Sequence, residues 1–226
     1  MVPPKPKPSI TLSFVALKEK QRAIRDGFPE AVGLRVHRAL SWLGRAEADL
    51  DDADVQFVLL WVGFNSAYAN DLSADVTSER GSFKAYFDAL VELDGNHRIY
   101  DAVWQRFPHE IRLLLNNKYV FSPFWNHHNG LDGYDDWAER LAASQQLIAT
   151  AMARRETSRM LSIVFDRLYV LRNQLIHGGA TWNSKINRDQ VRDGAAVMGW
   201  LLPIFIDIMM DNPRRDWGRP FYPVVE

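Results

Sequence analysis

The chain has 226 residues, a formal net charge of −1 and no cysteine. With 47% hydrophobic residues it can build one sizeable core, but it is too short for three domains. The near-neutral charge excludes a nucleic-acid binder that relies on bulk charge, so any such contact must be local. The lack of cysteine excludes disulfides, zinc–thiolate sites and cysteine nucleophiles, and it fits a reducing cytoplasm.

The first ten residues predict a disordered, proline-rich tail, and residues 11–226 predict a single all-helical domain. No apolar segment follows the positive charges of the tail, so no signal peptide is predicted. The longest apolar runs, 57–69 and 195–206, are shorter than the roughly 20 residues that a membrane-spanning helix needs. We therefore expect a soluble, cytoplasmic protein with no membrane contact.

Helical spacing dominates the rest of the chain, and no run alternates with the period of a strand, so the pattern predicts an all-α bundle. Apolar residues repeat on one face of 31–50, whereas 57–64 is apolar on all sides and predicts a central, buried helix. The predicted later elements are shorter helices at 83–93, 98–106 and 109–117, a loop at 121–130, a helix with a stripe from Trp137 to Met152, a reversal at 154–158, a helix at 158–177, a long helix at 188–210 kinked at Pro203, and an irregular aromatic tail at 217–223 that packs onto the helices.

The most informative segment ends the predicted helix 158–177 and reads Tyr-Val-Leu-Arg-Asn-Gln-Leu-Ile-His-Gly-Gly. On a helical wheel Arg172 lies about 40° from Leu168, inside the apolar arc. A guanidinium among leucines needs a carboxylate, a set of carbonyls, a phosphate or an interface. Gly178 and Gly179 predict that the helix stops directly after His177.

Asn173 and His177 lie four residues apart, on the other side of this helix and within reach of each other. An imidazole at a helix end suits general acid–base work near neutral pH. A plain structural interpretation competes with this, because a composition like this one gives Arg-x4-His by chance in about one chain in two. In that interpretation Arg172 only pairs with an acid of another helix, and His177 only caps its own helix.

The segment Leu171-Arg172-Asn173-x3-His177-Gly178 resembles the Arg-polar-x3-His signature of the HEPN superfamily, and the helix around Trp61 is similar to an early core helix of uncharacterised bacterial members. The resemblance covers about residues 30–211, and its specific part is about eight residues. It implies a helical bundle, with extra N-terminal and mid-chain helices, that dimerises so that paired motifs meet at a cleft. Such a pairing answers a geometric problem, since positions five apart on one helix diverge by about 140°.

The resemblance also implies an activity, which is endoribonucleolytic cleavage without metal or cofactor, in a toxin or phage-defence role. His177 would act as general acid or base, Arg172 would stabilise the charge on phosphorus, and Asn173 would orient the histidine or bind phosphate. The products would be a 2′,3′-cyclic phosphate and a 5′-hydroxyl. The implied partners are RNA, a second copy of the chain, and an antitoxin or defence-system protein. Some toxin members carry a tyrosine two residues after the histidine, and this chain departs from them with Gly179 there.

Other residues are weaker candidates for substrate contact. Lys185 and Trp182 follow the motif helix closely, and Lys185 is also consistent with an ordinary solvated lysine. Asn65, in the predicted central helix, fits either a polar lock of the core or part of the cleft. The pair His127-His128 favours a structural or substrate-contact loop over a metal site, because adjacent histidines point apart.

Two alternatives to the nuclease stay open at this stage. One is a catalytically silent HEPN-like module that binds RNA, a nucleotide or a protein partner, with Arg172 in a salt bridge inside one subunit. The other is a structural helical adaptor in which Arg172 and His177 form only a buried polar pair.

Overall fold

The protein is an all-α helical bundle, as the spacing predicted. The computed structural model describes residues 12–49, 51–68, 76–185, 188–220 and 222–224, apart from the side chains of residues 76–82, and this part of the chain contains no strand. The predicted tail at residues 1–10 lies outside the described residues. The helices are α1 (Phe14–Ile24), α2 (Glu30–Glu47), α3 (Ala53–Tyr68), α4 (Val76–Leu93), α5 (Arg98–Asp101), α6 (Pro108–Asn116), α7 (Ser122–His128), α8 (Trp137–Arg154), α9 (Thr157–Ile176) and α10 (Arg188–Asp211), with short turns η1 (Arg25–Gly27), η2 (Ala102–Arg106) and η3 (Lys118–Val120).

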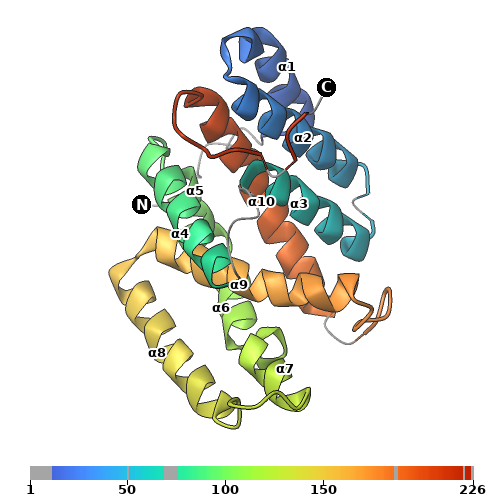
Figure 1. The fold of residues 1–226 in the computed structure, drawn as a ribbon, viewed down its shortest axis with the longest axis vertical. Coiled ribbons are helices and arrows are strands. Elements are labelled where there is room, and N and C mark those ends of the chain that lie inside the picture. The colour runs from blue at the N-terminus through green and yellow to red at the C-terminus, as the bar shows by residue number, and fades with distance from the viewer. Residues whose placement is uncertain (1–11, 50, 69–75, 186–187, 221, 225–226) are drawn as a thin grey trace, which may run out of the picture.

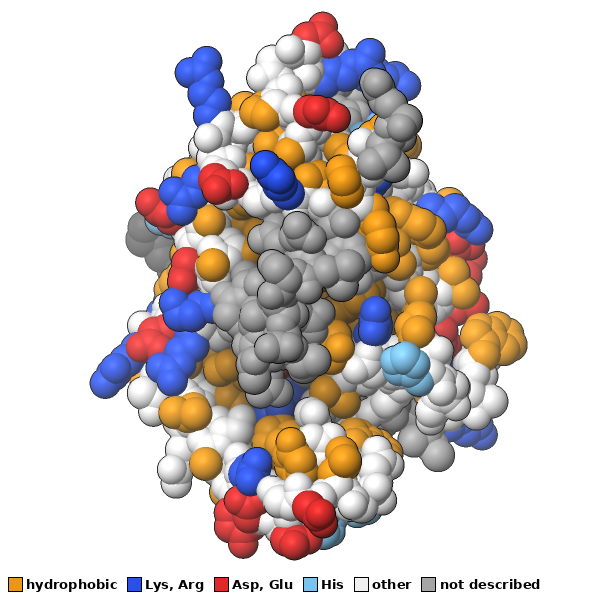
Figure 2. Space-filling view, viewed as in Figure 1, with side chains coloured by type: hydrophobic (Ala, Val, Ile, Leu, Met, Phe, Trp, Pro, Cys, Tyr) orange, Lys and Arg blue, Asp and Glu red, His pale blue; other side chains and the backbone are white. Residues whose placement is uncertain are grey.

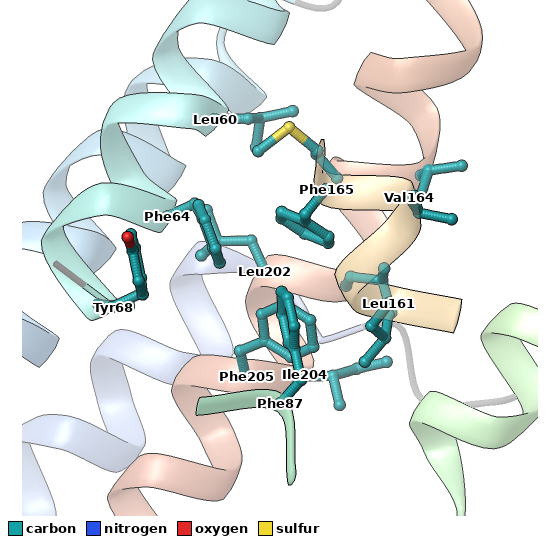
Figure 3. Packing of buried hydrophobic residues seen from close by; sticks show 14 of the residues in the cluster. Leu60, Phe64, Tyr68, Phe87, Leu161, Val164, Phe165, Leu202, Ile204 and Phe205 are labelled. Atoms are coloured by element: carbon teal, nitrogen blue, oxygen red, sulfur yellow. The ribbon is translucent and has the colours of Figure 1, made fainter. Parts of the chain in front are cut away.

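The helix α3 is central, as its apolar residues on all sides predicted. It packs against α2, α9 and α10, while α1 and α2 lie towards one end of the molecule and α7 and α8 towards the other (Figure 1). Phenylalanine rings from four helices, Phe64, Phe87, Phe165 and Phe205, meet in the core (Figure 3). The centroids of Phe64 and Phe165 are 4.5 Å apart, which fixes how α9 crosses α3.

The last long helix, α10, is apolar and long enough to cross a membrane by composition alone. However, 78% of its most apolar window is buried inside the protein, as in a core helix of a soluble protein. Pro203 lies within this helix and is itself buried. The apolar side chains of α10 therefore pack in the core of the protein.

A buried carboxylate on α10 ties two other helices to it. Asp207 accepts hydrogen bonds from Lys20 Nζ of α1 at 2.6 Å and from Arg98 Nη1 of α5 at 2.5 Å. Lys20 also pairs with Asp211, and Arg98 also pairs with Asp94. Burial lowers the pKa of Lys20, but its hydrogen bonds to the two aspartates outweigh burial and raise it. Each cation is thus shared between two carboxylates.

Residues 121–130, predicted as a loop, instead contain the helix α7, so that prediction was wrong. Pro123 occupies the first turn of α7, where its missing N–H costs no helical hydrogen bond. His128 Nδ1 lies 2.8 Å from the carbonyl oxygen of Phe124, and His127 Nδ1 lies 3.2 Å from Asp135 Oδ1. Both histidines therefore have structural partners within this region.

The start of the aromatic tail packs onto the helices as predicted, whereas Tyr222 is 69% exposed. Trp217 is buried, and its indole N–H donates to the carbonyl oxygen of Asn212 at 2.9 Å. Arg35 of α2, only 1% exposed, donates to the carbonyl oxygens of Gly218 and Arg219 at 3.3 and 2.7 Å. No local pattern predicts that Arg35 is buried, because its partners are the backbone carbonyls of Ala67, 32 residues away, and of Gly218 and Arg219, more than 180 residues away.

Candidate functional site

The C-terminal end of α9 carries the Arg-Asn-x3-His motif at the edge of the molecule, beside the N-terminal end of α3 (Figure 1). The helix ends at Ile176, as the two glycines predicted to within one residue. The His177 N–H donates to the Asn173 carbonyl oxygen at 3.0 Å, and Gly178 has φ +72°, a left-handed conformation that glycine adopts without strain. The chain therefore leaves the helix directly after the histidine, and His177 is exposed.

Arg172 is half-buried next to this end. Its Nη1 donates to Asn173 Oδ1 at 2.7 Å, and its guanidinium carbon lies 5.7 Å from the ring centroid of Tyr169. Among the described residues no carboxylate lies within ion-pair distance of Arg172. A half-buried guanidinium that only an amide and an aromatic ring contact keeps an uncompensated positive charge, which attracts an anion.

Asn173 is placed differently from what the sequence suggested. Its side-chain oxygen contacts Arg172, whereas His177 contacts Asn173 only through the backbone. Asn173 therefore positions the guanidinium, and no described hydrogen bond links it to the imidazole. Because His177 is exposed, the motif is not a buried polar pair of the kind that a purely structural adaptor would contain.

The loop after the motif docks onto the first turn of α3 through Asp52. One carboxylate oxygen of Asp52 accepts the backbone N–H groups of Asp54 and Val55, which is an N-cap of α3. The other accepts the indole N–H of Trp182 at 2.8 Å. The hydrogen bond from the Val55 N–H, followed by that from Trp182, lowers the pKa of Asp52. Trp182 is thus held by its nitrogen while its ring stays 69% exposed.

Asp54, which is buried, holds the same loop at a second point. It accepts the Asn183 N–H at 3.2 Å and pairs with Arg188 at the start of α10. These contacts join α3 to the loop and to α10 over more than 120 residues of sequence. The loop that carries Trp182 therefore lies in a defined position beside His177.

The other residues predicted to contact substrate do not all lie near the motif. Lys185 is exposed at the end of the same loop. Asn65 is half-buried on α3, eleven residues beyond Asp54, which is about 16 Å along a helix. The structure therefore brings Trp182 and Lys185 to the motif end of α9 and leaves Asn65 away from it.

One neighbour of the motif was missed by the sequence reasoning. The Gln174 side chain donates to the carbonyl oxygen of Tyr119, which also accepts the indole N–H of Trp125 at 2.7 Å. These hydrogen bonds attach η3 and α7 to the last turn of α9. Tyr119 contributes only its backbone carbonyl to these contacts, so the identity of its side chain does not predict them.

On the face that Figure 2 shows, charge does not favour extended binding of a polyanion. Figure 2 shows acidic and basic side chains interspersed on one face, with no broad patch of one sign. Among the described residues, no group of three or more His, Asp or Glu side chains could hold a metal ion. A phosphate bound at the motif would therefore have to rely on the few groups at the end of α9.

Comparison of the chain with family models, curated proteins and solved structures finds no match. What the chain does must therefore be argued from its own residues.

Proposed function

We propose that this chain is a metal-independent endoribonuclease of the HEPN type, with a composite active site at a homodimer cleft. One observation carries the proposal. Arg172 is half-buried, is held by Asn173, has no carboxylate partner among the described residues, and lies one turn before an exposed histidine. A cation and an imidazole that act on the same phosphate are suited to cleavage of a phosphodiester by a neighbouring 2′-hydroxyl.

The residues would divide the chemistry as follows. His177 takes the proton from the ribose 2′-oxygen or gives one to the leaving 5′-oxygen. The guanidinium of Arg172 offers paired N–H donors to the phosphoryl oxygens as negative charge develops on them. Asn173 limits the rotation of that guanidinium through its side-chain oxygen. The cleaved strands then end in a 2′,3′-cyclic phosphate and a 5′-hydroxyl.

A second copy of the chain is needed because one helix separates the two groups. Arg172 and His177 diverge by about 140° around α9. The segments at this end expose large apolar side chains, Ile176 at 51%, Trp182 at 69% and Val55 at 38%. Large apolar side chains that are exposed together beside polar groups are typical of a protein–protein interface. A homodimer across this surface would bring Arg172 of one copy towards His177 of the other.

The first test is RNA cleavage by the purified chain in excess EDTA. We expect wild-type protein to cleave, and His177→Ala and Arg172→Gln each to lower the rate by about a hundredfold or more. The exposed residues His109 and Arg192 supply controls, since His109→Ala and Arg192→Gln change the same residue types elsewhere. Circular dichroism checks that each variant is folded.

The second test addresses the shared site. When His177→Ala and Arg172→Gln proteins are mixed and allowed to exchange subunits, half of the dimers are mixed, and each mixed dimer has one complete site. Recovery of about a quarter of the wild-type rate is then expected. Activity that never recovers, in mixtures where exchange is demonstrated, would contradict a site shared between chains.

The remaining outcomes are also decisive. If the wild-type dimer binds RNA and leaves it intact, the chain is a catalytically silent binding module. If it neither binds nor cleaves, the nuclease proposal fails. A role as a toxin or in phage defence in the cytoplasm, with an antitoxin or defence-system partner, is part of the proposal, and it depends on cleavage being found.

A further inference from the structure

A hollow lies away from the end of α9. It has a volume of about 180 Å³ and is enclosed by η2, α6, the end of α8 and the start of α9. Its main lining residues are Trp104, Ile111, Arg112, Met152, Arg155 and Met160. This space is below the roughly 300 Å³ of a typical ligand pocket, so it suits only a small ligand and is too small for a nucleic-acid strand.

The inner wall of this hollow is apolar. Met160 and Ile111 are buried, at 0% and 3% exposure, and Met152 is half-buried. Trp104 is fixed in orientation because its indole N–H donates to Thr157 Oγ1 at 3.0 Å. An aromatic ring with its polar atom already satisfied, next to two methionines, offers a surface for a flat apolar group.

The rim is cationic. Arg112 is exposed and makes no ion pair with a described carboxylate. Arg155 contacts Tyr100, through a hydrogen bond to its hydroxyl and over its ring, and it also has no described acidic partner. The adjacent carboxylate, Glu156, is already engaged by Arg154 and Arg159. The positive charge at this hollow is therefore not neutralised by the described residues around it.

The backbone at the hollow is unusual in two places. Val103 and Trp104 lie in η2, a π-helical turn, and such turns occur frequently at functional sites. Arg155 ends α8 with φ 51°, a left-handed conformation in which glycine or asparagine is the usual residue. An arginine in this conformation is strained, and strained residues cluster at binding sites.

We propose that this hollow binds a small organic anion, with an apolar, preferably aromatic body against Trp104 and Met152 and a carboxylate or phosphate group at Arg112 and Arg155. The site is separate from the proposed nuclease centre and does not depend on it. The apolar wall supplies affinity by burial, and the two arginines supply selection for negative charge.

The test is titration calorimetry of the full-length protein with phenyl phosphate and with benzoate, which separate the two kinds of anionic group. We expect at least one to bind, and phenol and inorganic phosphate each to bind at least about tenfold more weakly. Absence of heat with both anions up to about 10 mM would overturn the proposal. Equal binding of inorganic phosphate would overturn the role of the apolar wall.

The decisive variant is Arg155→Gly. Glycine suits the left-handed conformation, so the melting temperature should stay the same or rise, while binding weakens at least about tenfold. Arg112→Gln should weaken binding similarly. Arg154→Gln is the matched control, because Arg154 is the adjacent exposed arginine, it pairs with Glu156, and it does not line the hollow. Binding that survives Arg155→Gly and Arg112→Gln unchanged would refute the assignment.

Discussion

Replacing Asp207 with alanine should lower the free energy of unfolding by about 3 kcal/mol. The carboxylate is only 9% exposed and accepts one hydrogen bond each from Lys20 and Arg98. A hydrogen bond to a charged group contributes about 1.5–3 kcal/mol, so losing two gives roughly 3–6 kcal/mol. The lower end applies, because Lys20 keeps Asp211 and Arg98 keeps Asp94, so neither cation is left without a partner.

The measurement is urea unfolding followed by tryptophan fluorescence, with midpoint and slope fitted separately. Asp211→Ala is the matched control, since it removes a carboxylate that contacts the same Lys20 from the same helix but is 53% exposed. That exposed pair should contribute less than about 1 kcal/mol. If the two variants lose the same stability, burial of Asp207 does not strengthen its ion pairs and the reasoning is wrong.

Two further predictions concern stability. Gly194→Ala should destabilise the protein by about 1–3 kcal/mol, because its new methyl would lie 3.0 Å from side chains of both α3 and α9. Gly199→Ala, whose new methyl has its nearest neighbour at 3.6 Å, should instead stabilise α10 by about 0.5–1 kcal/mol. Thermal unfolding of both variants tests this prediction, and equal shifts in melting temperature would contradict it. Burial raises the pKa of Glu47, outweighing the hydrogen bonds from the Phe14 N–H, so the folded state holds this proton more tightly than the unfolded state does. The stability that this proton provides is present below the ordinary pKa of 4.5 and is lost as pH rises through the raised value. The free energy of unfolding of Glu47→Gln, measured between about pH 4 and 7, should therefore rise relative to that of the wild type as pH rises. A difference that stays constant over this range would argue against the prediction.

Several features of the fold were readable from local patterns. The apolar residues on all sides of α3 predicted its central position, and the stripe from Trp137 to Met152 predicted α8. The pair Gly178-Gly179 predicted where α9 ends to within one residue. These succeed because helix period and helix ends depend on hydrogen bonds and side chains a few residues apart.

The candidate site was predictable only in part. The motif placed Arg172, Asn173 and His177 at one helix end. It did not show that the Asn173 side chain contacts Arg172, or that His177 is exposed. The sequence left open whether Asn65 is a polar lock of the core or part of the cleft, and the structure places Asn65 on α3, away from the motif. The helix α7 was missed because Pro123 and the polar residues after it look like a loop, although proline is tolerated in a first helical turn.

By itself, the sequence determined that this protein is all-helical, which helix is buried at its centre, and that an arginine and a histidine end one helix together. The tertiary structure alone decided which charges are paired between helices. Asp207 joins helices from both halves of the chain, Asp54 takes the arginine of α10, and Arg172 receives no described carboxylate. The physical reason is that ion pairs form between groups that packing brings within about 4 Å, and that proximity arises between residues more than a hundred positions apart, where no local pattern can specify it.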